Sequence, residues 1–277
     1  MFEYPEIKTL VRQMKNEIIN KKIHSAEIVR ANSNMFCGKD YTQYQYDAII
    51  GGTVVDVETL PHDIFIKLDN GWGILICQSG GKLLFNETSS KVPKNYNIIF
   101  NFTDNSSLTY TMNLFTLGLY AYKTGDWQAK KQNDGRLDPL GDMPFDAYIS
   151  SIKSEDELKK PIKLFLVNHV MGISSTFAAE ILLYAKIHPS VQVKKLSEDE
   201  QKNISGAMKC VLTAACDAGG RNSEYDLYGQ KGGYEAAAER KRIGADCPLC
   251  GATLLKHTTG GVTAYCPVCQ TKKQTNW

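Results

Sequence analysis

Residues 245–253 read ADCPLCGAT and residues 265–270 read YCPVCQ, so two Cys-x-x-Cys pairs lie near the C-terminus. The pairs are Cys247 with Cys250 and Cys266 with Cys269, and fifteen residues separate them. Because each pair directs two sulfurs toward one centre, the four thiolates can complete a tetrahedral zinc site. Residues 253–256 and 262–265 predict a hairpin with a Gly-Gly turn at 260–261. The pattern predicts a zinc ribbon with one structural Zn²⁺, and two disulfides are the alternative.

The composition limits the class of protein. The 277-residue chain is 43% hydrophobic and has 32 basic and 30 acidic side chains, giving a net charge of +2. This excludes a histone-like, uniformly basic DNA binder and supports a folded core in more than one domain. We find no signal peptide and no apolar run of membrane length. We therefore expect a cytoplasmic monomer without a membrane partner, in which thiols stay reduced.

The periodicity of apolar residues changes along the chain. Residues 3–20 have helical spacing. Short strand-like runs separated by turn signals follow at 23–29, 52–57, 64–68, 72–77, 97–103 and 107–114, with a further hairpin around 118–123. Residues 124–143 are polar and turn-rich, and four helical segments follow, the last beginning with a capping box of Ser197 and Glu200. We predict an α+β protein with four parts: an N-terminal helix and β-sandwich (1–123), a linker (124–143), a helical domain (144–240) and the ribbon (241–277).

Several stretches resemble the formamidopyrimidine-DNA glycosylase and endonuclease VIII family. They are MFEYPE at 1–6, LDPL at 137–140, MGISS at 171–175, AKIHP at 185–189, GGY at 232–234 and CPVCQ at 266–270. They follow the family's order along nearly the whole chain. The resemblance implies a helix-two-turn-helix in the helical domain, and DNA bound between that domain and the sandwich. It also implies double-stranded DNA, damaged or abasic, as the partner, with the damaged nucleotide flipped out.

The same resemblance points to individual site residues. Glu3 matches the family's catalytic glutamate, which moves protons beside a nucleophilic amine. Lys163, Gly172, Ser174 and Ser175 match the phosphate-binding part of the helix-two-turn-helix. Independently of the family, Gly172 precedes a helix N-terminus, whose free amides together with Lys163 favour an anion such as phosphate. An ordinary turn is the alternative for Gly172, and a favourable interaction with the helix dipole is the alternative for Glu3.

Four positions depart from the family's pattern. Phe2 replaces the N-terminal proline that forms the Schiff base, and His62 stands where the family has a lysine. Ser175 replaces an asparagine, and Gly261 replaces the arginine of the zinc finger. Glycine has no side chain with which to bind a phosphate or protonate a leaving group. In our alignment the family's wedge residues, which fill the gap left by the flipped base, fall at Ser79, Phe115 and Leu117.

Three functional hypotheses follow. The first is a damaged-DNA-binding protein on a glycosylase scaffold of base excision repair, with the usual glycosylase and abasic-site lyase chemistry impaired or lost. The second is an active DNA glycosylase or lyase with a substituted nucleophile, at Lys67, Lys82 or the amine of Met1. The third is a zinc-stapled interaction protein without DNA binding. Whether the chain is an enzyme is left open by the sequence.

Overall fold

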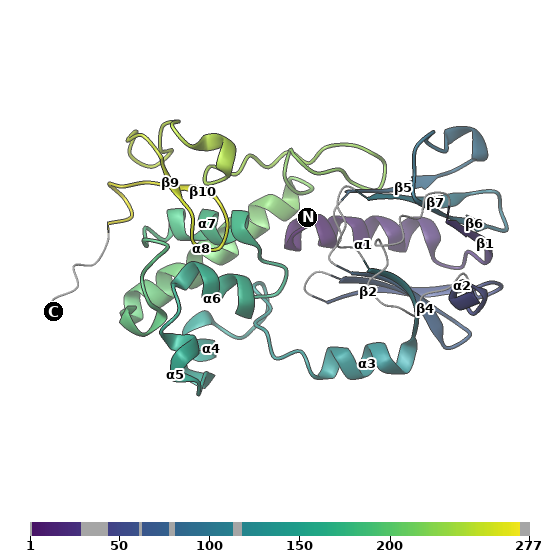
Figure 1. Cartoon of the computed structure of the whole chain (residues 1–277), viewed down its shortest axis with the longest axis horizontal. Coiled ribbons are helices and arrows are strands. Elements are labelled where there is room, and N and C mark those ends of the chain that lie inside the picture. The colour runs from purple at the N-terminus through teal and green to yellow at the C-terminus, as the bar shows by residue number, and fades with distance from the viewer. Residues whose placement is uncertain (1, 29–43, 61–62, 78–80, 113–117, 272–277) are drawn as a thin grey trace. The chain divides into compact units, whose positions relative to one another are not determined.

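The computed structural model describes residues 2–28, 44–60, 63–77, 81–112 and 118–271 (Figure 1). Their contacts divide the chain into two compact units. The N-terminal unit comprises residues 1–134 and 218–233, and the C-terminal unit comprises residues 135–217 and 234–277. Segment 218–233 thus belongs to the N-terminal unit, although it follows the helices of the other unit in sequence. Within the described ranges, no helix has the length and apolar character needed to cross a membrane.

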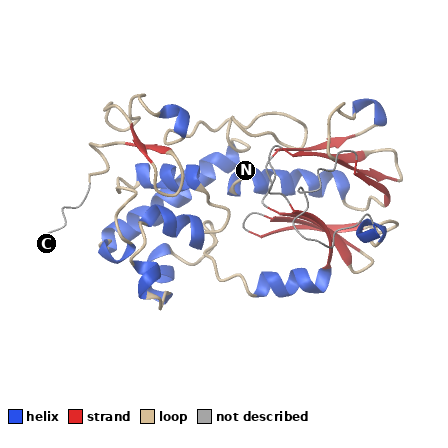
Figure 2. Ribbon diagram, in the orientation of Figure 1, coloured by secondary structure: helices blue, strands red, loops and turns tan. Residues whose placement is uncertain are grey.

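The N-terminal unit contains two four-stranded antiparallel sheets (Figure 2). One has the strand order β1-β6-β7-β5 and the other has the order β2-β3-β4-β8. The strands are β1 (Ile23–Ile28), β2 (Val54–Leu60), β3 (Asp63–Leu68), β4 (Trp72–Cys77), β5 (Gly81–Asn86), β6 (Ile98–Phe102), β7 (Ser107–Met112) and β8 (Gly118–Lys123). The helices are α1 (Tyr4–Ile18), α2 (Tyr44–Asp47), α3 (Thr124–Gln132) and the 3-10 turn η1 (Ser89–Lys91). The predicted sandwich is confirmed, whereas strand β5 and helix α3 were not predicted.

Helix α1 and both sheets share one hydrophobic core. The helix begins with Pro5 in its first turn, and the Glu6 carboxylate accepts a hydrogen bond of 2.7 Å from the Glu3 amide. Its buried apolar residues recur at helical spacing and therefore lie on one face. They are Ile7, Leu10, Val11, Met14 and Ile18. Phe2 belongs to the same core, so the first described residue of the chain is already part of the folded unit.

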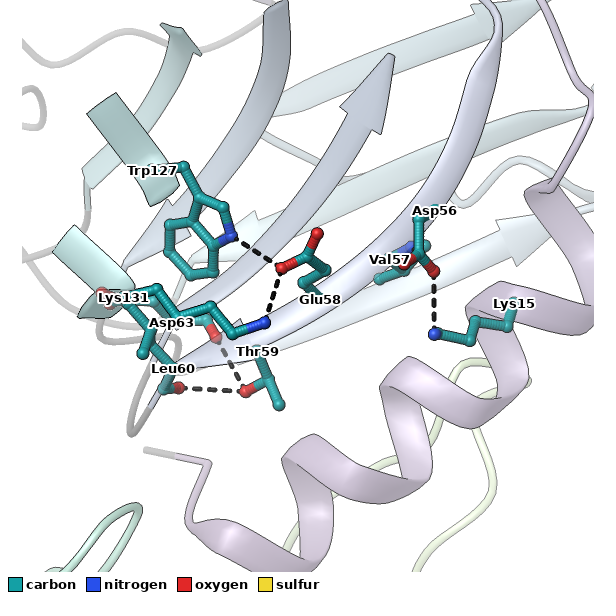
Figure 3. A network of polar contacts seen from close by, with 9 residues as sticks. All are labelled: Lys15, Asp56, Val57, Glu58, Thr59, Leu60, Asp63, Trp127 and Lys131. Atoms are coloured by element: carbon teal, nitrogen blue, oxygen red, sulfur yellow. Dashed lines mark hydrogen bonds and ion pairs between the residues drawn. The ribbon is translucent and has the colours of Figure 1, made fainter. Parts of the chain in front are cut away.

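Helix α3 covers the other face of sheet β2-β3-β4-β8. Side chains alternate across a strand, so Ile64 and Ile66 face the main core while Phe65 points to the opposite face. There the Phe65 ring stacks on Trp127 of α3, with the ring centroids 4.9 Å apart. The Trp127 indole N–H and the Lys131 ammonium donate to the Glu58 carboxylate at 3.2 and 2.9 Å (Figure 3). Part of the predicted linker is therefore a packed helix.

The C-terminal unit is helical apart from the ribbon. It contains α4 (Phe145–Ser151), α5 (Glu155–Leu158), α6 (Ile162–His169), α7 (Ser175–Tyr184), α8 (Glu198–Asp217) and the 3-10 turns η2 (Val193–Lys195) and η3 (Arg240–Arg242). Helix α8 packs against α4 and α7, and α6 packs against α7. The predicted capping box of α8 is confirmed, because the Ser197 amide donates to Glu200 at 2.8 Å and the Glu200 amide donates to Ser197 at 3.3 Å.

The ribbon hairpin consists of β9 (Leu255–His257) and β10 (Thr263–Tyr265), which pair antiparallel. Its turn contains Gly260 and Gly261, both with positive φ. The hairpin packs on α7 through a small core that includes Leu183, Leu254 and Cys266. The two strands are short, so this shared core and the cysteine cluster hold the ribbon on the helices.

Candidate functional site

The four cysteines of the ribbon lie together. Their Sγ atoms are all within 4.8 Å of one another. The amide of Leu249 donates to the Cys247 sulfur at 3.4 Å, and the amide of Cys269 donates to the Cys266 sulfur at 3.3 Å. Such amide donors stabilise thiolates, and four thiolates fit a tetrahedral metal ion with no open position. The cluster can hold a metal in a structural role.

Gln270 supports the second cysteine pair from behind. Its buried side chain accepts from the Cys266 amide at 2.8 Å and donates to the carbonyl of Ile187 at 2.9 Å. This amide joins the second cysteine pair to the segment that follows α7. A side chain of this kind acts as an outer support for a metal ligand.

Lys163 lies at the ribbon turn rather than on an exposed surface. Its side chain is 0% exposed. The ammonium donates to the carbonyl of Gly261 at 2.9 Å and to the hydroxyl of Thr263 at 2.8 Å. A direct contact with a DNA phosphate would therefore require the ammonium to leave these partners. In this structure Lys163, which the resemblance places at a DNA phosphate, connects α6 to the ribbon turn.

The other predicted phosphate-binding residues surround the N-terminus of α7. Gly172 has φ +66°, which brings the chain into the helix, and Ser174 is the residue at the N-cap. The Ser175 hydroxyl is buried and has no hydrogen-bond partner among the described residues. A Cβ placed on Gly261 would lie 2.6 Å from that hydroxyl. Lys163, Ser175 and Gly261 therefore meet at one place in the C-terminal unit.

The N-terminal unit encloses the predicted catalytic residue. Phe2 and Glu3 are both 0% exposed. The Glu3 carboxylate lies 3.0 Å from Nη1 of Arg221, which comes from segment 218–233. The Glu6 carboxylate accepts from the Arg221 amide, Nε and Nη2 at 2.8, 3.1 and 2.9 Å. Burial alone lowers the pKa of Arg221, but Glu3 and Glu6 outweigh it and raise that pKa, so the guanidinium stays charged.

Two buried groups were missed by the sequence reasoning. Arg221 lies in a Gly-rich, charged stretch without periodicity, so nothing local indicated that its side chain is buried. Glu180 of α7 is also buried, and it accepts from the Tyr234 hydroxyl and the amides of Ala237 and Ala238 at 3.0, 3.1 and 2.7 Å. Burial raises the pKa of Glu180, and these three hydrogen bonds oppose the shift.

Several other predicted positions are placed differently. Lys82 of β5 has its ammonium 3.8 Å from the centroid of the Tyr225 ring. Lys67 lies in β3, opposite Asp56 of β2. The positions outside the described residues are Met1, His62, Ser79, Phe115 and Leu117.

The fold and the cysteine cluster define an α+β protein with a β-sandwich unit and a helical unit that carries a four-cysteine ribbon. Residues 1–113 match the formamidopyrimidine-DNA glycosylase N-terminal domain. Formamidopyrimidine-DNA glycosylase of Rickettsia bellii (strain OSU 85-389) is 28% identical over 98% of this chain and 99% of its own length. The Exiguobacterium protein of that name (strain ATCC BAA-1283 / AT1b) is 27% identical with the same coverage.

Solved structures have the same fold. Lactococcus lactis Fpg in complex with DNA containing an abasic site superposes with a TM-score of 0.84 and 22% identity, over 98% of this chain and 100% of the other. The MutM (Fpg) protein from Thermus thermophilus gives a TM-score of 0.80 and 19% identity, with the same coverage. Over nearly its whole length the chain is therefore similar to proteins named formamidopyrimidine-DNA glycosylase, and it has the fold of the solved Fpg proteins.

Proposed function

We propose that this chain binds damaged or abasic double-stranded DNA and that the family's Schiff-base chemistry is impaired or lost. The observation that supports the proposal is the burial of residues 2 and 3 within the folded N-terminal unit. Phe2 is a core residue, and Glu3 forms an ion pair with Arg221. A nucleophile must be held close to the reacting carbon to be effective. Residue 2 instead provides a buried side chain for packing, and Glu3 faces a guanidinium.

DNA binding itself is supported by the family scaffold and by the N-terminus of α7. Free amides at a helix start attract phosphate, and Gly172 and Ser174 shape this one. Ser175 can donate from its hydroxyl. Lys163 would contribute indirectly, through the position of the ribbon turn. The Lys163 ammonium is buried, and Gly261 has no side chain where the family has an arginine. We therefore expect weaker phosphate binding than an exposed cation at either position would give.

The metal of the ribbon is proposed to be one structural Zn²⁺ held by Cys247, Cys250, Cys266 and Cys269. Fresh protein should contain about one equivalent of zinc, because four thiolates in a closed tetrahedral site favour that ion. Replacing Cys266 by serine should release the zinc and loosen the ribbon. Cys210→Ser is the matched control, because this exposed cysteine lies outside the cluster. Full zinc occupancy in the Cys266 variant would refute the assignment.

Two measurements test the proposed function. A gel-shift titration with abasic and undamaged duplexes should show binding that weakens steeply with added salt, because phosphate contacts release counterions. Borohydride treatment with the abasic duplex should trap little or no covalent complex, with an active family member as the positive control. Absence of binding at low salt would favour the zinc-stapled interaction protein instead.

The second candidate is an active glycosylase or lyase with a substituted nucleophile. It is favoured by the relatives, which carry the name glycosylase and match along nearly their whole length. Strong borohydride trapping that disappears in Glu3→Gln would establish this candidate and overturn the loss of chemistry. Trapping that disappears in Lys82→Arg would identify the amine of Lys82, which lies over the Tyr225 ring.

A further inference from the structure

Segment 218–233, here called the strap, runs along helix α1 within the N-terminal unit. Three residues of the helix bind the strap in order. They are spaced seven and four positions apart, and this spacing places them on one helical face. The pairs are Glu6 with Arg221, Gln13 with Asp226 and Leu227, and Glu17 with Tyr228. The strap is therefore fastened along α1 from the first turn to the last.

The two ends of the strap, residues 218–221 and 232–233, lie together and form its neck, and Leu227 at its tip is held in the core. The Gly233 amide donates to the carbonyl of Ala218 at 2.8 Å, which brings the two ends together. A Cβ on Gly232 would lie 2.2 Å from the Gly220 carbonyl, so the neck leaves no room for a side chain there. At the tip, Leu227 is buried in the main core and its carbonyl accepts from β5 at 2.9 Å.

Arg221 lies at this neck and is the cation shared by three carboxylates. Besides Glu3 and Glu6, Glu224 of the strap lies 3.7 Å from its Nη2. The Arg221 side chain is only 8% exposed. Removing the arginine from this buried cluster would leave Glu3 and Glu6 without their counter-charge, which is strongly unfavourable. The guanidinium therefore joins two segments that are more than 200 residues apart in sequence.

The strap carries a basic aromatic group. The Tyr225 ring has the Lys82 ammonium 3.8 Å from its centroid and the Lys231 ammonium 5.7 Å from it. An aromatic ring beside two ammonium groups suits a nucleic acid, because bases stack on rings and phosphates attract cations. Tyr225 lies four positions after Arg221, so the conformation of the neck affects where the Tyr225 ring lies beside Lys82 and Lys231.

We propose that Arg221 is a positioning residue. By binding Glu3, Glu6 and the strap at once, it fixes the Tyr225, Lys82 and Lys231 group in one arrangement for a damaged or abasic nucleotide. The inference rests on the proposed function in taking DNA as the ligand. Arginine stays protonated, so it provides a permanent charge beside Glu3 and no amine for imine formation.

The test compares Arg221→Gln and Arg221→Lys with the control Lys209→Gln, which removes an exposed charge on α8. Hydrogen exchange without DNA should become on the order of tenfold faster for the strap amides in Arg221→Gln, since its local opening becomes easier. Arg221→Lys should lie between this variant and the parent, because it keeps the charge and loses the planar fork. The control should leave strap exchange unchanged.

The second readout is discrimination between DNAs. Arg221→Gln should lower the ratio of affinities for abasic and undamaged duplexes on the order of tenfold, about what one lost charged contact costs. Arg221→Lys keeps the charge and should lower this ratio less. Unchanged strap exchange, or equal loss on both duplexes, would overturn the inference. Absence of DNA binding by the parent protein would instead overturn the proposed function. Should Arg221→Gln fail to fold, Glu224→Gln removes only the partner at 3.7 Å and tests the same exchange.

Discussion

Replacing Phe2 by proline restores the residue that the family uses as its nucleophile, and we expect it to damage this protein instead. Phe2 is 0% exposed and belongs to the main core. Truncating a buried phenylalanine to alanine costs about 3–5 kcal/mol, and proline retains part of the apolar volume, so we expect about 3 kcal/mol. In a domain of this size that corresponds to a fall in Tm of about 6–12 °C.

The assay is urea and thermal unfolding followed by tryptophan fluorescence; two of the three tryptophans, Trp72 and Trp127, lie in the N-terminal unit. Phe2→Leu is the matched control, because it keeps an apolar side chain and should cost only about 1 kcal/mol. We expect no gain in borohydride trapping from Phe2→Pro, since Glu3 remains paired with Arg221. Unfolding of Phe2→Pro at the parent's midpoint would refute the reasoning, and so would a trapped complex formed by this variant.

Three further predictions concern other parts of the chain. Gly261→Ala should destabilise the C-terminal unit by about 1–3 kcal/mol, because φ is +98° and the new Cβ would lie 2.6 Å from the Ser175 hydroxyl; equal Tm values for variant and parent would contradict this. Glu180→Gln should cost about 1–3 kcal/mol, because one carbonyl oxygen cannot replace two carboxylate oxygens. The exposed Glu198→Gln, which removes only a charge in the first turn of α8, should cost less than about 1 kcal/mol in the same thermal scan. Burial raises the pKa of Asp104, but hydrogen bonds from a lysine and a serine lower it to about 2. Its contribution to stability is therefore present above its ordinary pKa of 3.8 and is lost as the pH falls toward 2, so Asp104→Asn should flatten the unfolding free energy over that range; an unchanged slope would refute the assignment.

The local patterns were sufficient for much of the architecture. Cys-x-x-Cys spacing, the Gly-Gly turn and the Ser197 and Glu200 capping box each involve residues close together in sequence, so the backbone alone brings them together. The strands from β1 to β4 and the pair β6 and β7 were likewise marked by apolar runs with turn residues between them. The family resemblance extended these patterns to the order of the parts.

Tertiary structure decided what the individual site residues do. Sequence could identify Lys163 as a cation, but only packing against the ribbon shows that its ammonium binds Gly261 and Thr263. Segment 218–233 follows the helical domain in sequence, yet it packs on α1, where its buried Arg221 pairs with Glu3 and Glu6 of the N-terminus. Burial and charge pairing depend on residues far apart in the chain, so they cannot be predicted from a local sequence pattern.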